Sequence, residues 1–583
     1  MFTFLQIIGP CPCPDALAEE KSRHCLIDYR ERDGATVSDY RVLIYSDDWK
    51  SWNDPDVPEY FNPTTVLIDK HMGTAKADAT ALIVDEESYS YAAFLAQMCR
   101  VANGLQALKI EEGSRILLFG TDSVEFLATW FGAIRAGIVP VVLSDAYKAS
   151  NLLYFLDDTA AKSLFIDAEQ VEKLSEIADE IPWTLQNVIV RGDDTAGAPE
   201  AGGRETLTYR EMTEGHIDNF PPVPLHQNDV AYMFYSGGTT GAAKGITHLA
   251  HDFYLVPERH GNFMGYTPDD IVHATSKKYF THGIWPAVLV PFYLGATSVI
   301  SRLPPTAGNV VEVIERSRPT KLITVPTIIK NILLFAEQER VPDFSSLSLV
   351  TSASEKMPPE VFEKFHELFG LEVLDSIGSS EITYEWIANR PSDFRRGSLG
   401  RPIYGIEVKL MDSDDREVTE PGTDGEAWIK SRTTCFYYWR KLDKSRETFI
   451  GEWARTGDTL QFDEDGYFWF SGRSDDVFKV KGLWVSPIEV EAAITENDSV
   501  LEAAVVSYED SEGLTQAKAF IVLKPGTEVS ETLVDELKAG VRRIGGYKVP
   551  QEMAFVDVLP RTTLMKIDRR ALRMMEAESR AKG

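Results

Sequence analysis

Hydrophobic and polar positions along the chain repeat with two periods, one typical of helices and one of strands. Apolar side chains recur at helical spacing over residues 91–107 and 123–136, which predicts two amphipathic helices. Unbroken apolar runs at residues 115–120 and 138–143 predict buried strands. Because helices and strands alternate, we expect an α/β fold in which helices flank the mixed sheets of a large N-terminal domain.

The alternation continues to about residue 470. Apolar runs at residues 321–325 and 371–375 predict further strands, and residues 193–204, rich in Gly, Ala and Pro, predict a surface loop. Aromatic segments on either side of residues 463–466 predict two strands joined by a tight turn.

A second, smaller pattern follows residues 472–476. It predicts an α+β unit with helices near residues 487–495 and 530–543 and strands near residues 501–507 and 517–523. We place the boundary between Ser474 and Asp475. The expected domains are an N-terminal extension of unknown role (1–55), a large domain (56–474) and a small C-terminal domain (475–583).

Composition and charge narrow the class of protein. A chain of 583 residues with 44% hydrophobic side chains is large enough for several buried cores. The 90 acidic and 59 basic residues give a net charge of −31, which argues against nucleic acid or an anionic membrane as a partner. An anionic substrate therefore requires positive charge concentrated at its site.

The five cysteines are too few for a disulfide scaffold, so we expect a protein of the reducing cytoplasm. Cys11, Cys13, His24 and Cys25 lie close together, but their spacing is not that of a zinc site, and we expect no metal there.

Two apolar stretches are not interpreted as membrane or export signals. No basic residue precedes residues 2–8, so we expect no signal peptide there. Residues 284–300 contain Pro286, Pro291 and Gly295 and are short for a membrane span, so we expect them in the core.

A loop rich in glycine and hydroxyl groups carries the first chemical signal. It follows a predicted buried strand at residues 230–235. Bare backbone N–H groups, hydroxyls and a lysine suit a polyphosphate. The residues are Ser236, Gly237, Gly238, Thr239, Thr240, Gly241 and Lys244.

This loop is not a Walker A motif, because Ala243 precedes Lys244 and Gly245 follows it. Taken alone, the loop is also compatible with a flexible turn.

Four further segments agree with the loop and stand in a fixed order after it, at residues 375–381, 451–458, 472–482 and 560–569. With them the chain, over roughly residues 56–575, resembles the adenylate-forming superfamily of acyl-CoA synthetases, luciferases and peptide-synthetase adenylation domains. Within that superfamily residues 118–123, 126–137, 378–381 and 473–491 are most similar to benzoate–CoA ligases.

The resemblance implies a two-step reaction. A carboxylic acid attacks the α-phosphate of ATP to give an acyl-adenylate, and a thiol then displaces AMP. It also implies a small, mobile C-terminal lid that turns at Asp475 between the two steps.

By the resemblance, Lys566 places positive charge between the carboxylate and the α-phosphate. Glu381 and Thr240 are implied to hold Mg²⁺, a cation that prefers oxygen ligands. The alternatives from residue type alone are a surface lysine at Lys566 and a helix cap at Glu381.

The nucleotide contacts are implied in the same way. Asp458 and Arg473 are expected at the ribose hydroxyls, and Asp375 at the adenine amino group. The alternatives are turn carboxylates at Asp458 and Asp375 and an interdomain ion pair at Arg473. Lys481 and Gly482 are expected beside CoA, with a solvated lysine as the alternative for Lys481.

The acid pocket is predicted at Phe280, His282, Gly283 and Tyr384, with Ile382 and Trp386 as further apolar walls. His282 and Tyr384 each need a hydrogen-bond partner, which is either the other of the two or a substituent of the acid. The alternative for each is ordinary core packing without contact to the substrate.

We therefore expect an AMP-forming acid–CoA ligase that uses ATP, Mg²⁺ and CoA, acts on a benzoate-like acid and is a monomer or homodimer. The alternatives are an aliphatic or alicyclic acid, transfer to a carrier-protein thiol, and a non-catalytic acyl or nucleotide sensor. Retention of Lys566, Glu381 and Asp458 together argues against the sensor.

Overall fold

A computed structural model describes Asp54 and residues 56–582, apart from residues 200–203, 237–242, 355–356, 358, 474–475, 477, 481–482, 511–512 and 562–566. Its contacts divide the chain into two units, residues 1–59 and 60–583. Cys11, Cys13, His24 and Cys25 lie outside the described residues. The elements that follow all belong to the second unit.

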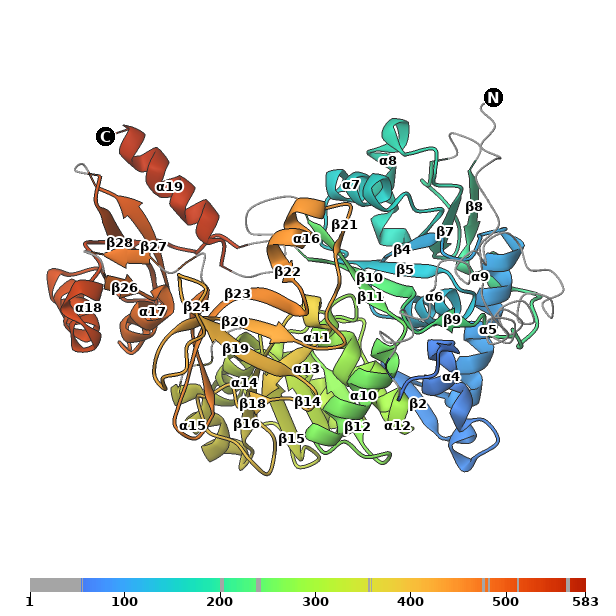
Figure 1. The fold of residues 1–583 in the computed structure, drawn as a ribbon, viewed down its shortest axis with the longest axis horizontal. Helices are drawn as coiled ribbons and strands as arrows, with labels where there is room; N and C mark the ends of the chain where they lie inside the picture. The colour runs from blue at the N-terminus through green and yellow to red at the C-terminus, as the bar shows by residue number, and fades with distance from the viewer. Residues whose placement is uncertain are drawn as a thin grey trace, which may run out of the picture. The chain divides into compact units, whose positions relative to one another are not determined.

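An eight-stranded sheet carries the predicted glycine-rich loop between two of its strands (Figure 1). Strands β10, β5, β4, β6, β7 and β8 run parallel to one another. Strand β11 pairs antiparallel with both β10 and β21. The predicted strands at residues 115–120 and 138–143 are confirmed as β4 and β5. In spatial order the strands are β21 (Tyr438–Trp439), β11 (Lys244–Leu249), β10 (Val230–Ser236), β5 (Val139–Leu143), β4 (Arg115–Phe119), β6 (Ser163–Asp167), β7 (Asn187–Arg191) and β8 (Glu205–Thr208).

A nine-stranded sheet is the second sheet of the large domain. It is parallel from β16 to β2, with antiparallel strands at both edges. In spatial order the strands are β18 (Arg401–Pro402), β17 (Glu385–Ala388), β16 (Val373–Gly378), β15 (Leu349–Ser352), β14 (Lys321–Thr324), β12 (Ile271–Ala274), β13 (Thr297–Ile300), β2 (Thr80–Val84) and β3 (Glu87–Ser90).

Strand β16 differs from its prediction at residues 371–375, since it begins at Val373 and continues to Gly378. Asp375 pairs with Ser352 of β15, and Ser376 pairs with Ala388 of β17. Neighbours on both sides therefore hold polar residues in a strand that their own sequence does not favour.

The helices follow their predicted positions closely where local capping signals are present. Helices α5 (Tyr91–Ala107) and α6 (Val124–Arg135) confirm the two predicted amphipathic helices, and they pack against each other. The hydroxyl of Ser90 accepts from the Ala93 N–H at 3.1 Å, and that of Ser123 accepts from the Phe126 N–H at 3.0 Å. These side chains satisfy N–H groups that the first helical turn leaves without partners.

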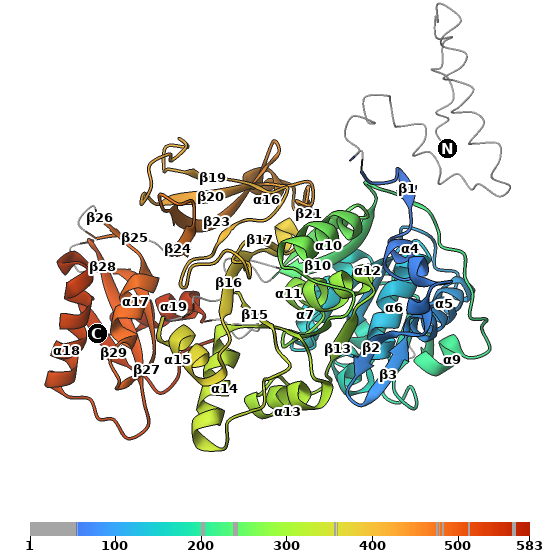
Figure 2. The ribbon, with the colours of Figure 1, turned by 90° about the horizontal axis from the view of Figure 1, so that it is seen from below.

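The other helices of the large domain lie on both sides of the sheets (Figures 1 and 2). They are α4 (Pro63–Leu67), α7 (Ala149–Thr159), α8 (Val171–Ser175), α9 (Tyr209–Thr213), α10 (Asp252–Phe263), α11 (Thr281–Ile284), α12 (Val290–Leu294), α13 (Ala307–Ser317), α14 (Pro326–Gln338), α15 (Pro359–Phe369) and α16 (Leu442–Thr448).

The apolar stretch at residues 284–300 is core, as predicted. It forms the end of α11, a π-helical turn η6 (Trp285–Leu289), α12 and β13, and Ile284, Trp285 and Leu289 are fully buried. Across the described residues, no helix has the length and apolar character needed to cross a membrane.

A five-stranded antiparallel sheet completes the residues before the predicted boundary. Its strands are β19 (Glu407–Met411), β20 (Gly425–Lys430), β23 (Trp453–Phe462), β22 (Phe449–Ile450) and β24 (Phe468–Arg473).

The C-terminal residues form the predicted α+β pattern. A three-stranded sheet has β27 antiparallel and β29 parallel to β28, and β25 and β26 form a separate hairpin. The elements are β25 (Phe478–Val480), β26 (Leu483–Val485), α17 (Pro487–Thr495), β27 (Val500–Glu509), β28 (Thr515–Leu523), α18 (Glu531–Ile544), β29 (Glu552–Phe555) and α19 (Arg569–Lys582).

A buried arginine at the end of α6 ties together segments distant in sequence. The guanidinium of Arg135 donates to both carboxylate oxygens of Asp69, at 2.8 and 2.9 Å, and to the Phe220 carbonyl at 2.8 Å. Only 4% of the Arg135 side chain is exposed. The guanidinium is thus desolvated and bound in a bidentate geometry, although 28% of the Asp69 side chain is exposed, so loss of this arginine is costly.

We expect Arg135→Gln to lower the midpoint of thermal unfolding by roughly 5–10 °C, because Asp69 loses its partner. Differential scanning calorimetry measures this shift. The control is Arg340→Gln, since Arg340 makes an equally bidentate pair with Glu315 but its side chain is 54% exposed. Equal shifts in the two variants would contradict the importance assigned to burial.

Candidate active site

The glycine-rich loop joins two paired strands. Ser236, the last residue of β10, pairs directly with Lys244, the first residue of β11. Both ends of the loop are therefore fixed in the eight-stranded sheet. Gly237, Gly238, Thr239, Thr240 and Gly241 lie outside the described residues, so their contact with polyphosphate stays a prediction.

Lys244 and Glu381, predicted from separate segments, meet at one tyrosine. Tyr438 on β21 donates from its hydroxyl to Glu381 Oε1 at 2.9 Å. The ammonium of Lys244 lies 4.7 Å from the centre of the Tyr438 ring, within range of a cation–π interaction. Burial raises the pKa of Tyr438 and the Glu381 charge raises it further, so the phenol remains a proton donor.

The position of Glu381 suits a magnesium ligand. It lies in a 3-10 turn, η7 (Ser380–Ile382), that directly follows β16 and is half-buried. Within the described ranges, no group of three or more His, Cys, Asp or Glu side chains is arranged so that it could hold a metal ion by itself. A single carboxylate fits Mg²⁺, because this ion is usually held by one or two carboxylates together with substrate phosphates.

The segment predicted to line the acid pocket is joined to this turn. The Thr281 hydroxyl lies 3.3 Å from the Ser380 hydroxyl, within hydrogen-bond distance. Phe280 precedes α11 and is half-buried. Gly283 is required here, since a Cβ atom at this position would lie 2.1 Å from the Lys277 carbonyl oxygen.

His282 and Tyr384 are neighbours, but each contacts a different residue as well. Their ring centres are 6.0 Å apart. His282 Nδ1 lies 3.0 Å from the Ser276 hydroxyl, and the Tyr384 ring meets the His260 ring edge-on at 4.8 Å. Burial raises the pKa of Tyr384 well above its usual value, and the nearby Glu385 adds to this effect.

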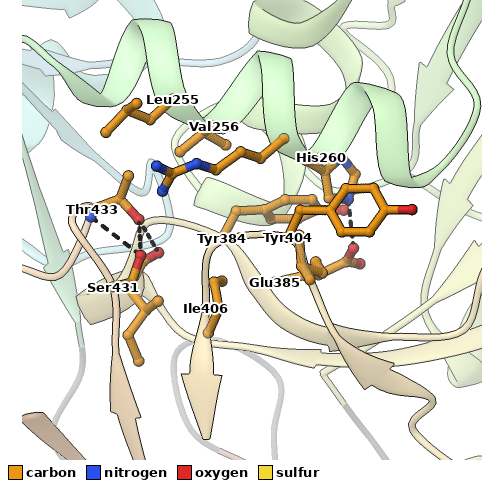
Figure 3. Close-up of a pocket in the computed structure, with 12 residues that line it drawn as sticks. Leu255, Val256, His260, Tyr384, Glu385, Tyr404, Ile406, Ser431 and Thr433 are labelled. Carbon is orange, nitrogen blue, oxygen red and sulfur yellow. Dashed lines mark hydrogen bonds and ion pairs between the residues drawn. The ribbon is translucent and has the colours of Figure 1, made fainter. Parts of the chain in front are cut away.

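A buried contact between a histidine of α10 and a carboxylate lies beside Tyr384 (Figure 3). His260 Nε2 lies 2.7 Å from Glu385 Oε2, and the Ser376 hydroxyl donates to Glu385 Oε1 at 2.6 Å. Burial alone would raise the pKa of Glu385, but the hydrogen bond and charge of His260 hold it below its usual value. Sequence analysis did not identify His260 or Glu385, because neither lies in a motif.

A cavity lies between α10 and the segments that follow η7 (Figure 3). Its volume is about 20 Å³, enough for roughly one water molecule. It is therefore too small for a benzoate ring. Its lining includes Leu255, Val256, His260, Ile382, Tyr384 and Thr433.

Trp386 was expected to be a wall of the acid pocket, and the structure does not support this. Its side chain is fully buried in a core cluster with Leu399, Ala427 and Leu460. The cluster joins β17 to the five-stranded sheet, since it holds Trp386 and Ile387 together with Leu410, Ala427 and Leu460.

Asp458 was expected at the end of a loop, but it lies within strand β23. The ladder with β20 shifts between Glu426 and Trp428, so residues 456–458 form a bulge, and Gly457 has a φ of 70°. A bulge redirects side chains locally and needs a residue that tolerates positive φ.

Asp458 and Arg473 pair across β23 and β24, with Arg473 Nη1 2.7 Å from Asp458 Oδ1. Arg473 also donates to the Thr456 carbonyl at 3.1 Å. Arg473 therefore forms an ion pair within the predicted large domain, with Asp458 as its partner, and not the interdomain ion pair that was the alternative for it. A ribose contact for either residue stays a prediction.

Asp375 is buried within β16, where its carbonyl accepts from the backbone and side-chain N–H groups of Asn389 at 3.1 and 3.0 Å. Ile377, two residues on, packs beside the cluster that holds Trp386. The remaining predicted site residues, Lys566, Lys481, Gly482 and Asp475, lie outside the described residues.

Comparison with known proteins agrees with this arrangement. A model of the AMP-binding enzyme family matches residues 69–439, and a model of the AMP-binding enzyme C-terminal domain matches residues 489–566. The chain is 34% identical to a benzoate–CoA ligase of Thauera aromatica over 89% of this chain and 96% of the relative. It is also 34% identical to a 4-hydroxybenzoate–CoA/benzoate–CoA ligase of Rhodopseudomonas palustris, over 88% of this chain and 94% of the relative.

Two solved structures extend the similarity to the fold. An anthranilate CoA ligase in complex with anthranoyl-AMP has a TM-score of 0.84 and 33% identity, over 90% of this chain and 99% of that chain. A benzoate CoA ligase from Burkholderia xenovorans has a TM-score of 0.79 and 31% identity, over 88% of this chain and 100% of that chain. The resemblance inferred from the motifs is confirmed, and the chain belongs to the AMP-binding enzyme family of the adenylate-forming superfamily.

Proposed function

We propose that the protein is an AMP-forming acid–CoA ligase for benzoate-like aromatic acids. A carboxylate oxygen of the acid attacks the α-phosphorus of ATP and releases pyrophosphate. The CoA thiol then attacks the carbonyl carbon of the acyl-adenylate, and AMP leaves. Similarity to ligases of benzoate, hydroxybenzoate and anthranilate supports an aromatic acid.

One observation carries the proposal. The turn that holds Glu381 contacts both predicted halves of the site, because Tyr438 links it to Lys244 and Thr281 links it to the acid-pocket segment. A phosphate-binding lysine, a carboxylate for a cation and a candidate acid pocket thus converge on a few residues. The adenylation step requires this convergence, since ATP and the acid must meet in one place.

The charged residues have distinct proposed tasks. Lys566 reduces the electrostatic repulsion between the carboxylate of the acid and the α-phosphate of ATP, and Lys244 attracts the polyphosphate. Glu381, with Thr240, holds Mg²⁺, which draws charge from the phosphate oxygens when bound. Asp458 accepts hydrogen bonds from the ribose hydroxyls.

Other tasks concern the second step and the setting of the enzyme. We propose that Lys481 and Gly482 lie beside CoA and that Asp475 is the hinge between a large domain and a lid. We also propose a cytoplasmic location and a monomeric or homodimeric state.

The first test is release of AMP from ATP with a panel of acids, with and without CoA. We expect AMP release to require an acid, to accelerate with CoA, and to be fastest with benzoate or its hydroxy or amino derivatives. Octanoate better than every cyclic acid by about tenfold in kcat/KM, or about 1.4 kcal/mol, would overturn the aromatic assignment. An equal rate of AMP release with and without CoA would instead favour a carrier-protein acceptor.

Lys566→Ala should abolish formation of the acyl-adenylate while pre-formed acyl-adenylate still reacts with CoA. The reason is that its charge is needed where two anions meet and not where a thiol displaces AMP. The two half-reactions are measured separately by pyrophosphate release and by thioester formation. Equal loss of both would contradict the role given to Lys566.

We expect His282→Ala and Tyr384→Phe to change the order of preference among cyclic acids by at least a few-fold in kcat/KM. Both side chains bring polar atoms to the predicted pocket, whereas ATP is expected elsewhere on the same turn. The KM for ATP should therefore stay within about twofold. A large change in the KM for ATP with an unaltered acid preference would remove both residues from the pocket.

A further inference from the structure

The turn that carries Glu381 ends in a strained residue. Thr383, directly after η7, has a φ of 81° and a ψ of −53°, in a region that a β-branched side chain rarely adopts. Its side chain is fully buried. A conformation of this kind persists only where the surrounding contacts leave the backbone no alternative.

A histidine from the other sheet supplies one such contact. His248 on β11 is buried, with Nε2 2.7 Å from the Ser380 carbonyl oxygen and Nδ1 3.0 Å from Asp252 Oδ2. The two ring nitrogens thus face different groups, one on the turn and one on α10. The ring also stacks on Tyr232 at 4.9 Å with 13° between the planes, which fixes its orientation.

The carboxylate of Asp252, at the start of α10, gathers the other groups around the turn. The Tyr232 hydroxyl donates to Asp252 Oδ2 at 3.3 Å, and His251 Nε2 lies 3.3 Å from Asp252 Oδ1. The Thr383 hydroxyl lies 3.4 Å from Asp252 Oδ2 and donates to the Thr433 carbonyl at 2.7 Å. The strained residue is therefore held from α10 and from the segment after β20.

We propose that His248 and Asp252 are positioning residues for the cation-binding carboxylate. Asp252 orients the His248 ring, and His248 fixes the Ser380 carbonyl, so that Glu381 is aimed before ATP arrives. This inference rests on the proposed role of Glu381 as a magnesium ligand. Groups that orient a metal ligand without touching the metal are worth about 10–100-fold in affinity or activity.

Two replacements of His248 separate its two hydrogen bonds. His248→Asn retains a donor near the Nδ1 position, which faces Asp252, but its side chain is too short to reach Ser380. His248→Gln places a donor near the Nε2 position, which faces Ser380. We expect His248→Asn to weaken the magnesium contribution to ATP binding by about tenfold, and His248→Gln to retain most of it.

The measurement is the Kd of ATP by calorimetry without acid, first with EDTA and then with Mg²⁺. The ratio of the two Kd values measures how much Mg²⁺ strengthens ATP binding, and no turnover is needed to obtain it. In parallel, the Mg²⁺ concentration for half-maximal AMP release should rise in His248→Asn while the KM for the acid stays within about twofold. Thermal unfolding of each variant confirms that it is folded.

A matched control is His273→Asn. His273 is also a buried histidine that faces a backbone carbonyl, with Nδ1 3.1 Å from the Val299 oxygen, but it lies on β12. It should leave the magnesium ratio unchanged. If His248→Asn also leaves it unchanged, or if His248→Gln loses as much as His248→Asn, the positioning role is wrong.

Glu381→Gln distinguishes failure of this inference from failure of the proposed function. If Glu381→Gln reduces the magnesium ratio and a folded His248→Asn does not, Glu381 remains the ligand and the inference alone fails. If Glu381→Gln has no effect on the ratio, the assignment of Glu381 itself fails, and the inference fails with it.

Discussion

The candidate site depends on one constraint, which is that a turn at the end of β16 is fixed against a hairpin of a different sheet. The nine-stranded sheet supplies Glu381, whereas the eight-stranded sheet supplies Lys244, Tyr438 and His248. Neither sheet holds the site alone. The hydrogen bonds of Tyr438 to Glu381 and of His248 to Ser380 cross between the sheets, so these bonds set the distance between the predicted phosphate loop and the predicted cation ligand.

Much of the fold was predictable because many of its signals are local. Helices α5 and α6 carry their own periodicity and their own capping serines, so their bounds agree with the sequence pattern. Asp375 and Asp458 were placed at strand or loop ends, where polar residues are usually found. Both lie inside strands, because pairing with distant neighbours and a bulge at Gly457 override the local preference.

The site was predictable only where its residues lie in ordered motifs. The motifs identified Lys244, Glu381 and the pocket segment, but not the groups that bring them together. Tyr438 lies 57 positions from Glu381, and His248 lies 132 positions from Ser380. No spacing rule along one chain connects such pairs, since they depend on how two sheets pack. Trp386 shows the converse error, in which an aromatic residue near a motif proves to be core.

This arrangement places polar and ionisable side chains in the protein interior. Asp252, His248, His260 and Glu385 are all nearly inaccessible, and each is within reach of an oppositely charged or hydrogen-bonding partner. Apolar residues of the same volume often stabilise such positions by about 1–4 kcal/mol. Apolar side chains form no directional bonds, however, so the strained backbone conformation at Thr383 would no longer be enforced by its surroundings. The protein is therefore less stable than it would be with an apolar core at these positions. In return, the carboxylate of Glu381 and the side chain of Tyr384 are held in fixed positions, as a functional site requires.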